Sequence, residues 1–189
     1  MRIIGGTSGG RFLKAPKGFD VRPTPDLVKQ AVFNSLGGRV EQARVLELFG
    51  GSGALSLESL SRGAARAIIV EKSARTAHLI RGNFESLGLD QVTLRVQDAF
   101  VAIHQLKAAG QVFGLIFADP PYGEKNTGRR SESFAQRLLD DPNLCALLAA
   151  DGTFVLGHSK RDSLELTPAW RERKLMKHGD SIMRFLEAA

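Results

Sequence analysis

The sequence contains a single cysteine, Cys145, which excludes an internal disulfide and a zinc site with several cysteine ligands. It also lacks an apolar run of membrane-spanning length, because the longest candidates are strand-sized pieces such as residues 115–118. The first six residues, MRIIGG, do not have the apolar core of a signal peptide. The four histidines have no mutual spacing typical of metal ligands. These features predict a cytoplasmic protein without a metal centre, in which the histidines are packed or solvated.

The composition is that of one compact globular domain. The chain has 189 residues, of which 43% are hydrophobic and 24% charged. Lysine and arginine outnumber aspartate and glutamate by 26 to 20, and the excess is concentrated near the start of the chain. The basic residues there are Arg2, Arg11, Lys14, Lys17 and Arg22. Such a segment can contact the phosphates of a nucleic acid or can be a solvated surface, and charge alone does not choose between the two.

From residue 44 onward, short apolar segments alternate with helical patterns. We expect strands at residues 45–49, 67–71, 92–96, 112–118 and 152–157, and helices at 27–36, 54–62, 73–87, 99–108 and 131–149. Residues 174–177 and 181–186 predict a closing antiparallel hairpin. The predicted fold is therefore α/β: a doubly wound, mostly parallel seven-stranded sheet with helices on both faces. Residues 1–22 are expected to be a basic extension, a hairpin or an arm, and residues 23–189 the main domain.

A glycine-rich turn, Phe49-Gly50-Gly51-Ser52-Gly53, follows the first expected strand. Glycines there let a ligand approach the backbone, beyond the carboxyl ends of the strands. The dinucleotide-binding pattern is not met, because Ser56 stands where its third glycine would be. Glu47 precedes the turn, and its carboxylate would repel a pyrophosphate but suits a ligand that carries an ammonium or a sulfonium group.

Acidic residues also end the next two expected strands. Glu71, followed by Lys72, can accept hydrogen bonds from both hydroxyls of an adenosine ribose. Asp98, followed by Ala99, can accept one from the adenine amine, although by itself it is more typical of a helix N-cap. Three carboxylates at successive strand ends fit an adenosine with a cationic amino-acid tail, so we predict S-adenosylmethionine as the cofactor.

The fourth expected strand ends in Asp119-Pro120-Pro121-Tyr122. Consecutive prolines fix φ and remove two backbone donors, which would hold Asp119 and the Pro120 carbonyl as acceptors for the exocyclic amine of a base. Tyr122, the only tyrosine, offers a ring on which a flipped base can stack. The alternative is a turn that only ends a strand. Because a sulfonium is already a good leaving group, alignment of the amine with the methyl group matters more than a strong base.

Two of these motifs resemble those of a known enzyme class. Residues 47–53 resemble the first motif of class I S-adenosylmethionine methyltransferases, and residues 119–122 resemble the motif of members that methylate amino groups, including DNA adenine methylases and several RNA enzymes. A more specific resemblance is to the RsmD family of 16S ribosomal RNA guanine-N2 methyltransferases. It is carried by residues 1–6, Arg22-Pro23-Thr24, residues 46–58 and Ser61-Arg62-Gly63-Ala64, and it extends to the last strand.

The resemblance implies a monomeric, Rossmann-like enzyme that methylates one guanine of small-subunit rRNA, preferably in an assembled subunit. It implies that the methionine part of the cofactor is held by Glu47, Gly50, Gly51, Ser52 and Gly53. Glu71 would hold the ribose and Asp98 with Ala99 the adenine; we include Phe49 and Lys72 in the same site. Residues 119–122 would hold the base. The family commonly has Asp at the position of Glu47 and Ala at that of Gly50, and both differences are mild.

Two other functions are compatible with these motifs. A DNA adenine-N6 methyltransferase would share the Asp-Pro-Pro-Tyr motif, but the chain has no evident separate domain for target recognition. A non-catalytic RNA-binding assembly factor would keep the fold without turnover, whereas this sequence retains Glu47, Glu71, Asp98 and Asp119. We therefore expect an rRNA guanine-N2 methyltransferase.

Overall fold

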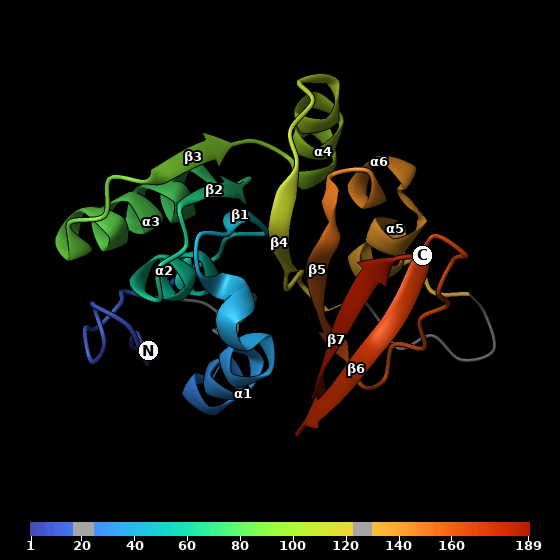
Figure 1. Ribbon diagram of the computed structural model, residues 1–189, viewed down its shortest axis with the longest axis horizontal. Helices are drawn as coiled ribbons and strands as arrows, with labels where there is room; N and C mark the ends of the chain where they lie inside the picture. The colour runs from blue at the N-terminus through green and yellow to red at the C-terminus, as the bar shows by residue number, and fades with distance from the viewer. Residues whose placement is uncertain (17–24, 123–129) are drawn as a thin grey trace.

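The computed structural model of the protein describes residues 1–16, 25–122 and 130–189. Within these residues, seven strands form one sheet in the order β3-β2-β1-β4-β5-β7-β6 (Figure 1). Strands β1 to β5 pair in parallel, whereas β7 is antiparallel to both β5 and β6. The predicted α/β fold, with its closing antiparallel hairpin, is confirmed. Among the described helices, none combines the length and the apolar character that a membrane span requires.

The strands are β1 Arg44–Leu48, β2 Arg66–Glu71, β3 Val92–Val96, β4 Phe113–Ala118, β5 Leu148–Ser159, β6 Trp170–His178 and β7 Ser181–Ala188. The helices are α1 Asp26–Leu36, α2 Ala54–Ser61, α3 Ala74–Leu87, α4 Ala99–Ala108, α5 Phe134–Asp140 and α6 Pro142–Cys145, with a short 3-10 helix, η1 Gly37–Val40.

The prediction of one helix over residues 131–149 is wrong. The structure divides this segment into α5 and α6, and β5 already begins at Leu148. Pro142 has no amide hydrogen with which to continue α5, but its fixed φ suits the first turn of a new helix. Asp141 caps that helix, since its carboxylate accepts a hydrogen bond of 2.9 Å from the Asn143 amide. Leu148 pairs with Phe113, so the residues after α6 join the sheet.

Two apolar layers enclose the sheet. Helices α4, α5 and α6 pack on one face, and α1, α2 and α3 on the other (Figure 1). Successive residues of a strand point to opposite faces. In β1, Leu46 belongs to the first layer and Val45 to the second. Glu47 therefore lies on the face that α1 and α2 cover.

The N-terminal residues form a hairpin that packs on α2. The Ile3 amide donates to the Arg11 carbonyl at 2.9 Å, and the Gly10 amide donates to the Ile3 carbonyl at 2.9 Å. Ile3 is fully buried in the same layer as α1 and α2. Residue 6 has φ +77°, and a Cβ there would lie 1.7 Å from the Ser61 carbonyl oxygen, so only glycine allows this close approach.

Candidate functional site

The site lies where the strand order of the sheet reverses. From β1 the chain builds outward through β2 and β3, and then continues with β4 on the other side of β1. Ligands bind at the carboxyl ends of the strands at such a point. Glu47 pairs in register with Phe117, and Asp119 follows two residues later, so both carboxylates belong to the same face of the sheet. The structure thus brings together the ends of the two motifs that the sequence singled out.

Glu47 is a buried acid at the carboxyl end of β1, in the region between the ends of β1 and β4 that we call the crevice. Its side chain is only 4% exposed, and its Oε2 accepts a hydrogen bond of 2.9 Å from the Ser56 amide in the first turn of α2. Burial raises the pKa of Glu47 to about 7; the Ser56 hydrogen bond opposes this shift, and the negative charge of Asp119 adds to it. The two acids are therefore electrostatically coupled, and Glu47 titrates near neutral pH.

Glu71 holds the glycine-rich turn in place. Its Oε2 accepts a hydrogen bond from the Gly51 amide at 3.0 Å, and its Oε1 accepts one from the Ser73 amide at 2.8 Å. The turn is also packed closely against β2, because a Cβ at Gly50 would lie 2.6 Å from a methyl carbon of Ile69. Carboxylate oxygens have further lone pairs, so Glu71 can still accept hydrogen bonds from a ligand.

Asp98 is the N-cap of α4, as its position before a helix suggests. Its Oδ1 accepts a hydrogen bond from the Phe100 amide at 3.0 Å, and its Oδ2 lies 3.3 Å from Lys72 Nζ. Partial burial would raise the pKa of Asp98, but these two donors together hold it below its usual range. Ala99, the first residue of α4, is buried beside it. The capping role and a cofactor role are compatible, since a carboxylate has two oxygens.

Three phenylalanine rings, one of them in the first turn of α4, form a cluster that the sequence did not reveal. The ring of Phe49 lies 6.4 Å from that of Phe100 and 5.5 Å from that of Phe134, centroid to centroid. The Arg137 guanidinium lies over the Phe100 ring at 4.2 Å. Phe49 has a left-handed backbone with φ 59°, which is unusual for a residue other than glycine. The three rings come from the turn after β1, from α4 and from α5, so no local sequence pattern predicts that they meet.

Asp119 lies against the end of β5. A Cβ on Gly157 would come within 2.3 Å of Asp119 Oδ1, so the carboxylate occupies the space of the missing side chain. Pro120 is buried, whereas Pro121 and Tyr122 are exposed. The Tyr122 hydroxyl is 2.6 Å from Ser181 Oγ, at the start of β7. In the segment 119–122, the Asp119 carboxylate is therefore packed against β5, whereas the Tyr122 side chain is exposed.

Beneath this corner lies a small pocket that includes His158 and Asp162. His158 is buried, its Nε2 accepts a hydrogen bond of 3.0 Å from Arg184 Nε, and its Nδ1 is 2.9 Å from the Ser159 carbonyl. Burial lowers the pKa of His158, and the charge of Arg184 lowers it further. This histidine is packed, which is one of the two roles predicted for the histidines. Asp162 is 4% exposed, and its Oδ1 has no hydrogen-bond partner among the described residues.

The basic residues predicted to contact RNA lie at the N-terminal hairpin and after it. Arg2, Arg11 and Lys14 are exposed. Lys17 and Arg22 lie outside the described residues.

Asn83 on α3 ties this segment to the glycine-rich turn. It exchanges two hydrogen bonds of 2.9 Å with the Lys14 backbone, and its Nδ2 also donates to the Ser52 carbonyl at 3.0 Å. The basic segment and the turn are thus fixed to each other through one buried amide. In the parts of the chain that the structure describes, no three His, Cys, Asp or Glu side chains form a metal-binding group.

Comparisons with known proteins identify similar sequences and similar solved structures. Residues 1–187 match the family described as "Conserved hypothetical protein 95". Over 168 residues, the chain is 34% identical to "Putative rRNA methyltransferase YlbH" of Bacillus subtilis, covering 88% of this chain and 87% of that protein. Over 122 residues, it is 35% identical to "Ribosomal RNA small subunit methyltransferase D" of Escherichia coli, covering 65% of this chain and 60% of that protein.

Solved structures share the architecture of this chain. The structure described as "Putative methyltransferase yhhF from Escherichia coli" superposes with a TM-score of 0.80 at 29% identity, covering 100% of this chain and 99% of that one. A more distant structure, described as "SMU.776, a putative methyltransferase complexed with SAH", has a TM-score of 0.67 at 17% identity and covers 87% of this chain and 50% of that one. The fold is that of class I methyltransferases. The chain therefore belongs to the Conserved hypothetical protein 95 family, the family of RsmD-like and YlbH-like methyltransferases.

Proposed function

We propose that this protein transfers the methyl group of S-adenosylmethionine to the exocyclic N2 amine of a guanine in 16S ribosomal RNA, and that it acts as a monomer on the small ribosomal subunit. The observation that carries the proposal is that the Glu47 and Asp119 carboxylates lie at the carboxyl ends of the neighbouring strands β1 and β4, close enough for the charge of Asp119 to raise the pKa of Glu47. The names of the relatives from Bacillus subtilis and Escherichia coli support rRNA as the substrate class.

The donor and acceptor groups of the crevice fit this cofactor. Glu47 and the turn at residues 50–53 would hold its methionine part, because a buried carboxylate stabilises an ammonium group. Glu71 would accept hydrogen bonds from the ribose hydroxyls, and Asp98 with Ala99 would face the adenine, with Phe49 and Lys72 alongside. When bound, the cofactor supplies a methyl group on a positively charged sulfur, which is a good leaving group. A more distant protein of this fold was solved as a complex with SAH, which is consistent with this assignment.

Asp119 and the Pro120 carbonyl would accept the two hydrogens of the base amine. The lone pair of that nitrogen is delocalised into the ring, and two acceptors in fixed positions orient it toward the methyl group. The gain comes chiefly from alignment. The new nitrogen–carbon bond would replace the carbon–sulfur bond, and S-adenosylhomocysteine would leave as a neutral thioether. The nitrogen would become acidic in this step, and one of its protons would then pass to solvent. The Tyr122 ring would stack on the base, a contact that is typically worth about 1–3 kcal/mol.

The basic residues of the N-terminal segment, Arg2, Arg11, Lys14, Lys17 and Arg22, would contact the RNA backbone. We propose that residues 1–22 serve as this contact and that residues 23–189 carry the catalytic domain. The exposure of Arg2, Arg11 and Lys14 supports this assignment. Asn83 hydrogen-bonds to both Lys14 and Ser52, and these bonds would hold the RNA-contacting segment at a fixed position relative to the glycine-rich turn.

Methylation of small subunits that lack the modification tests the proposal. Isotope-labelled S-adenosylmethionine, the protein and these subunits are incubated together, and the labelled nucleoside is identified by mass spectrometry. We expect N2-methylguanosine at one position of 16S rRNA. The Asp119→Asn variant should lose at least about 100-fold in rate, because alignment is lost, while its affinity for S-adenosylhomocysteine changes by less than about twofold.

Two results would contradict the proposal. N6-methyladenosine as the product, in RNA or in DNA, would assign the protein to the adenine methyltransferases. Failure to bind S-adenosylmethionine at millimolar concentration in calorimetry would favour a non-catalytic assembly factor.

A further inference from the structure

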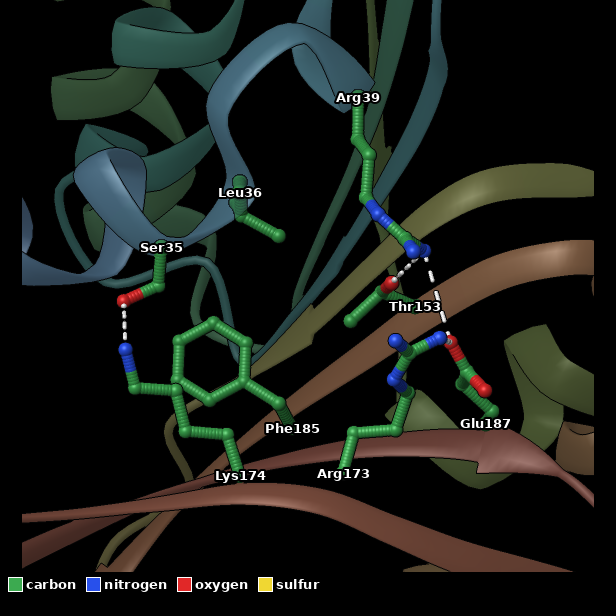
Figure 2. Close-up of a pocket in the computed structure, with 8 residues that line it drawn as sticks. All are labelled: Ser35, Leu36, Arg39, Thr153, Arg173, Lys174, Phe185 and Glu187. Carbon is green, nitrogen blue, oxygen red and sulfur yellow. Dashed lines mark hydrogen bonds and ion pairs between the residues drawn. The ribbon is translucent and has the colours of Figure 1, made fainter.

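A solvent-open groove lies between α1 and the C-terminal hairpin, away from the crevice. The space between its walls, open solvent included, is about 520 Å³, and the walls include Leu36, Arg39, Arg173, Lys174, Phe185 and Glu187. Figure 2 shows the Phe185 ring in the middle of the groove, Lys174 reaching across to Ser35 at one end, and Arg39 and Arg173 converging on Glu187 at the other. The groove is therefore apolar at its centre and charged at both ends.

Cations outnumber anions in this groove. Glu187 Oε1 accepts hydrogen bonds from Arg173 at 2.6 Å and Arg39 at 3.5 Å, and its Oε2 accepts one from Arg171 at 3.0 Å. Lys174 Nζ donates to the neutral Ser35 hydroxyl at 2.8 Å. Three guanidinium groups thus contact one carboxylate, whose own side chain is only 7% exposed, and Lys174 adds a cation at the other end of the groove.

Arg39 and Arg173 have further N–H donors with which they can bind a second anion. A guanidinium has five N–H donors, and Arg173 uses its Nη1 for the hydrogen bond to Glu187. The side chains of Arg39 and Arg173 are 44% and 52% exposed. Arg39 donates to the Asp151 carbonyl and the Thr153 hydroxyl, each at 3.3 Å, through the same Nη1 that contacts Glu187, so, as far as the described residues are concerned, its Nε and Nη2 donors remain for a ligand. A phosphate is a common ligand of a guanidinium group, since it can accept two parallel N–H hydrogen bonds from one arginine.

A β-bulge gathers these cations on one side. β6 and β7 pair Glu172 with Leu186, but the next pair is Lys174 with Phe185, which leaves Arg173 as an extra residue in β6. Without the bulge, Arg173 and Lys174 would point to opposite faces of the hairpin. With it, both side chains line the groove. A bulge commonly redirects a side chain in this way, at a cost in strand pairing.

The groove lies on the same face of the sheet as Asp119. Thr153, at the floor of the groove, and Gly157, against Asp119, are both on β5 and are separated by an even number of residues. Val155 between them packs in the layer of α1 and α2. At about 3.3 Å per residue, the two positions are roughly 13 Å apart along the strand. Because Val155 is fully buried, an RNA element that contacts both would have to pass over the residues that cover it.

We propose that this groove binds a phosphate group of the RNA backbone, through Arg39, Arg173 and Lys174, while the target base occupies the crevice. The inference rests on the proposed function for the identity of the RNA, but it makes a separate claim about binding. Glu187 positions the arginines and, as the one anion among the described residues of the groove, opposes the phosphate. Its removal should therefore strengthen RNA binding, which a purely structural ion-pair network would not predict.

The test measures the dissociation constant of the full chain for small ribosomal subunits at several salt concentrations. We expect Arg173→Gln and Lys174→Gln each to weaken binding by about 10-fold, and each to reduce the slope of log affinity against log salt by about one. Glu187→Gln should tighten binding several-fold. Lys107→Gln, which removes an exposed charge on α4, is the matched control and should change binding by less than about twofold. Thermal unfolding and S-adenosylhomocysteine binding verify that each variant is folded.

Either of two results overturns the inference. In the first, Arg173→Gln and Lys174→Gln bind subunits as the Lys107→Gln control does. In the second, inorganic phosphate binds in calorimetry and loses affinity in Arg173→Gln, while the affinity for subunits is unchanged, which would make the groove a site for a small anion. Because wild-type methylation is measured separately, failure here does not imply failure of the proposed activity.

Discussion

The carboxylate of Asp119 occupies the space that a side chain on Gly157 would need, since a Cβ there would lie 2.3 Å from Oδ1. The two residues are adjacent across β4 and β5, whose register pairs Ala118 with Leu156. The position of the acid at the crevice therefore depends on a residue 38 positions further along the chain.

Substitution of Gly157 by alanine should displace Asp119 without removing it. A displacement of about 1 Å can cost about 100-fold in rate, so we expect a loss of that order in methyl transfer, with little change in cofactor affinity. Rate and S-adenosylhomocysteine affinity are measured side by side. Gly114→Ala on β4 is the control, because its Cβ would meet only Ala43, at 3.7 Å. Equal activity in the two variants would show that the contact has no role in positioning Asp119.

The buried Glu47 predicts a pH dependence of stability. Its pKa is about 7 in the folded protein, where burial favours the protonated form, and 4.5 is its ordinary value. The folded state thus holds an extra proton between these values, so the contribution of Glu47 to stability is greatest at low pH and decreases as pH rises through 7. We expect the free energy of unfolding to decrease by up to about 3 kcal/mol between pH 4.5 and 8, relative to Glu47→Gln. Parallel pH profiles for the two proteins, from urea unfolding, would contradict this.

Glu71→Gln should weaken cofactor binding. The substitution replaces the negatively charged carboxylate, whose oxygens accept hydrogen bonds from the Gly51 and Ser73 amides, by a neutral amide. The proposed charged acceptor for the ribose hydroxyls is lost with it. Hydrogen bonds to a charged group contribute about 1.5–3 kcal/mol, so we expect S-adenosylhomocysteine to bind roughly 10- to 100-fold more weakly in calorimetry. Asp90→Asn, an exposed acid beyond α3, is the control. An unchanged affinity for Glu71→Gln would remove this residue from the cofactor site.

Glu58 is expected to hold the N-terminal hairpin in place. Its fully buried carboxylate accepts hydrogen bonds from the Ile4 amide at 2.7 Å and the Gly5 amide at 2.9 Å, and it pairs with Arg62 at 2.7 Å. Loss of one partner from a buried ion pair typically costs about 3–5 kcal/mol, so Glu58→Ala should destabilise the protein by about that amount. Faster hydrogen exchange at Ile4 and Gly5 should accompany the loss. Glu85→Ala on α3, where the glutamate is exposed, should affect neither; slow exchange in Glu58→Ala would mean that other contacts hold the hairpin.

The sequence by itself determined the order and type of most elements, since apolar periodicity and the Gly and Pro signals are local properties of the chain. It also identified the two motifs that meet at the crevice, because parallel strands align their carboxyl ends at one edge. The wrong prediction of one helix over residues 131–149 also had a local cause. The helical spacing of apolar residues continues across Asp141-Pro142, but the helix itself does not continue there, because proline cannot donate the backbone hydrogen bond.

Tertiary structure alone decided which distant groups became partners. Three contacts join residues far apart in the chain. They are the pairing of β7 with both β5 and β6, the packing of Asp119 against Gly157 and the ion pair of Arg39 with Glu187. No local pattern encodes such contacts, because they depend on strand order and register. A buried polar group needs a partner, but only the folded chain shows which group that partner is.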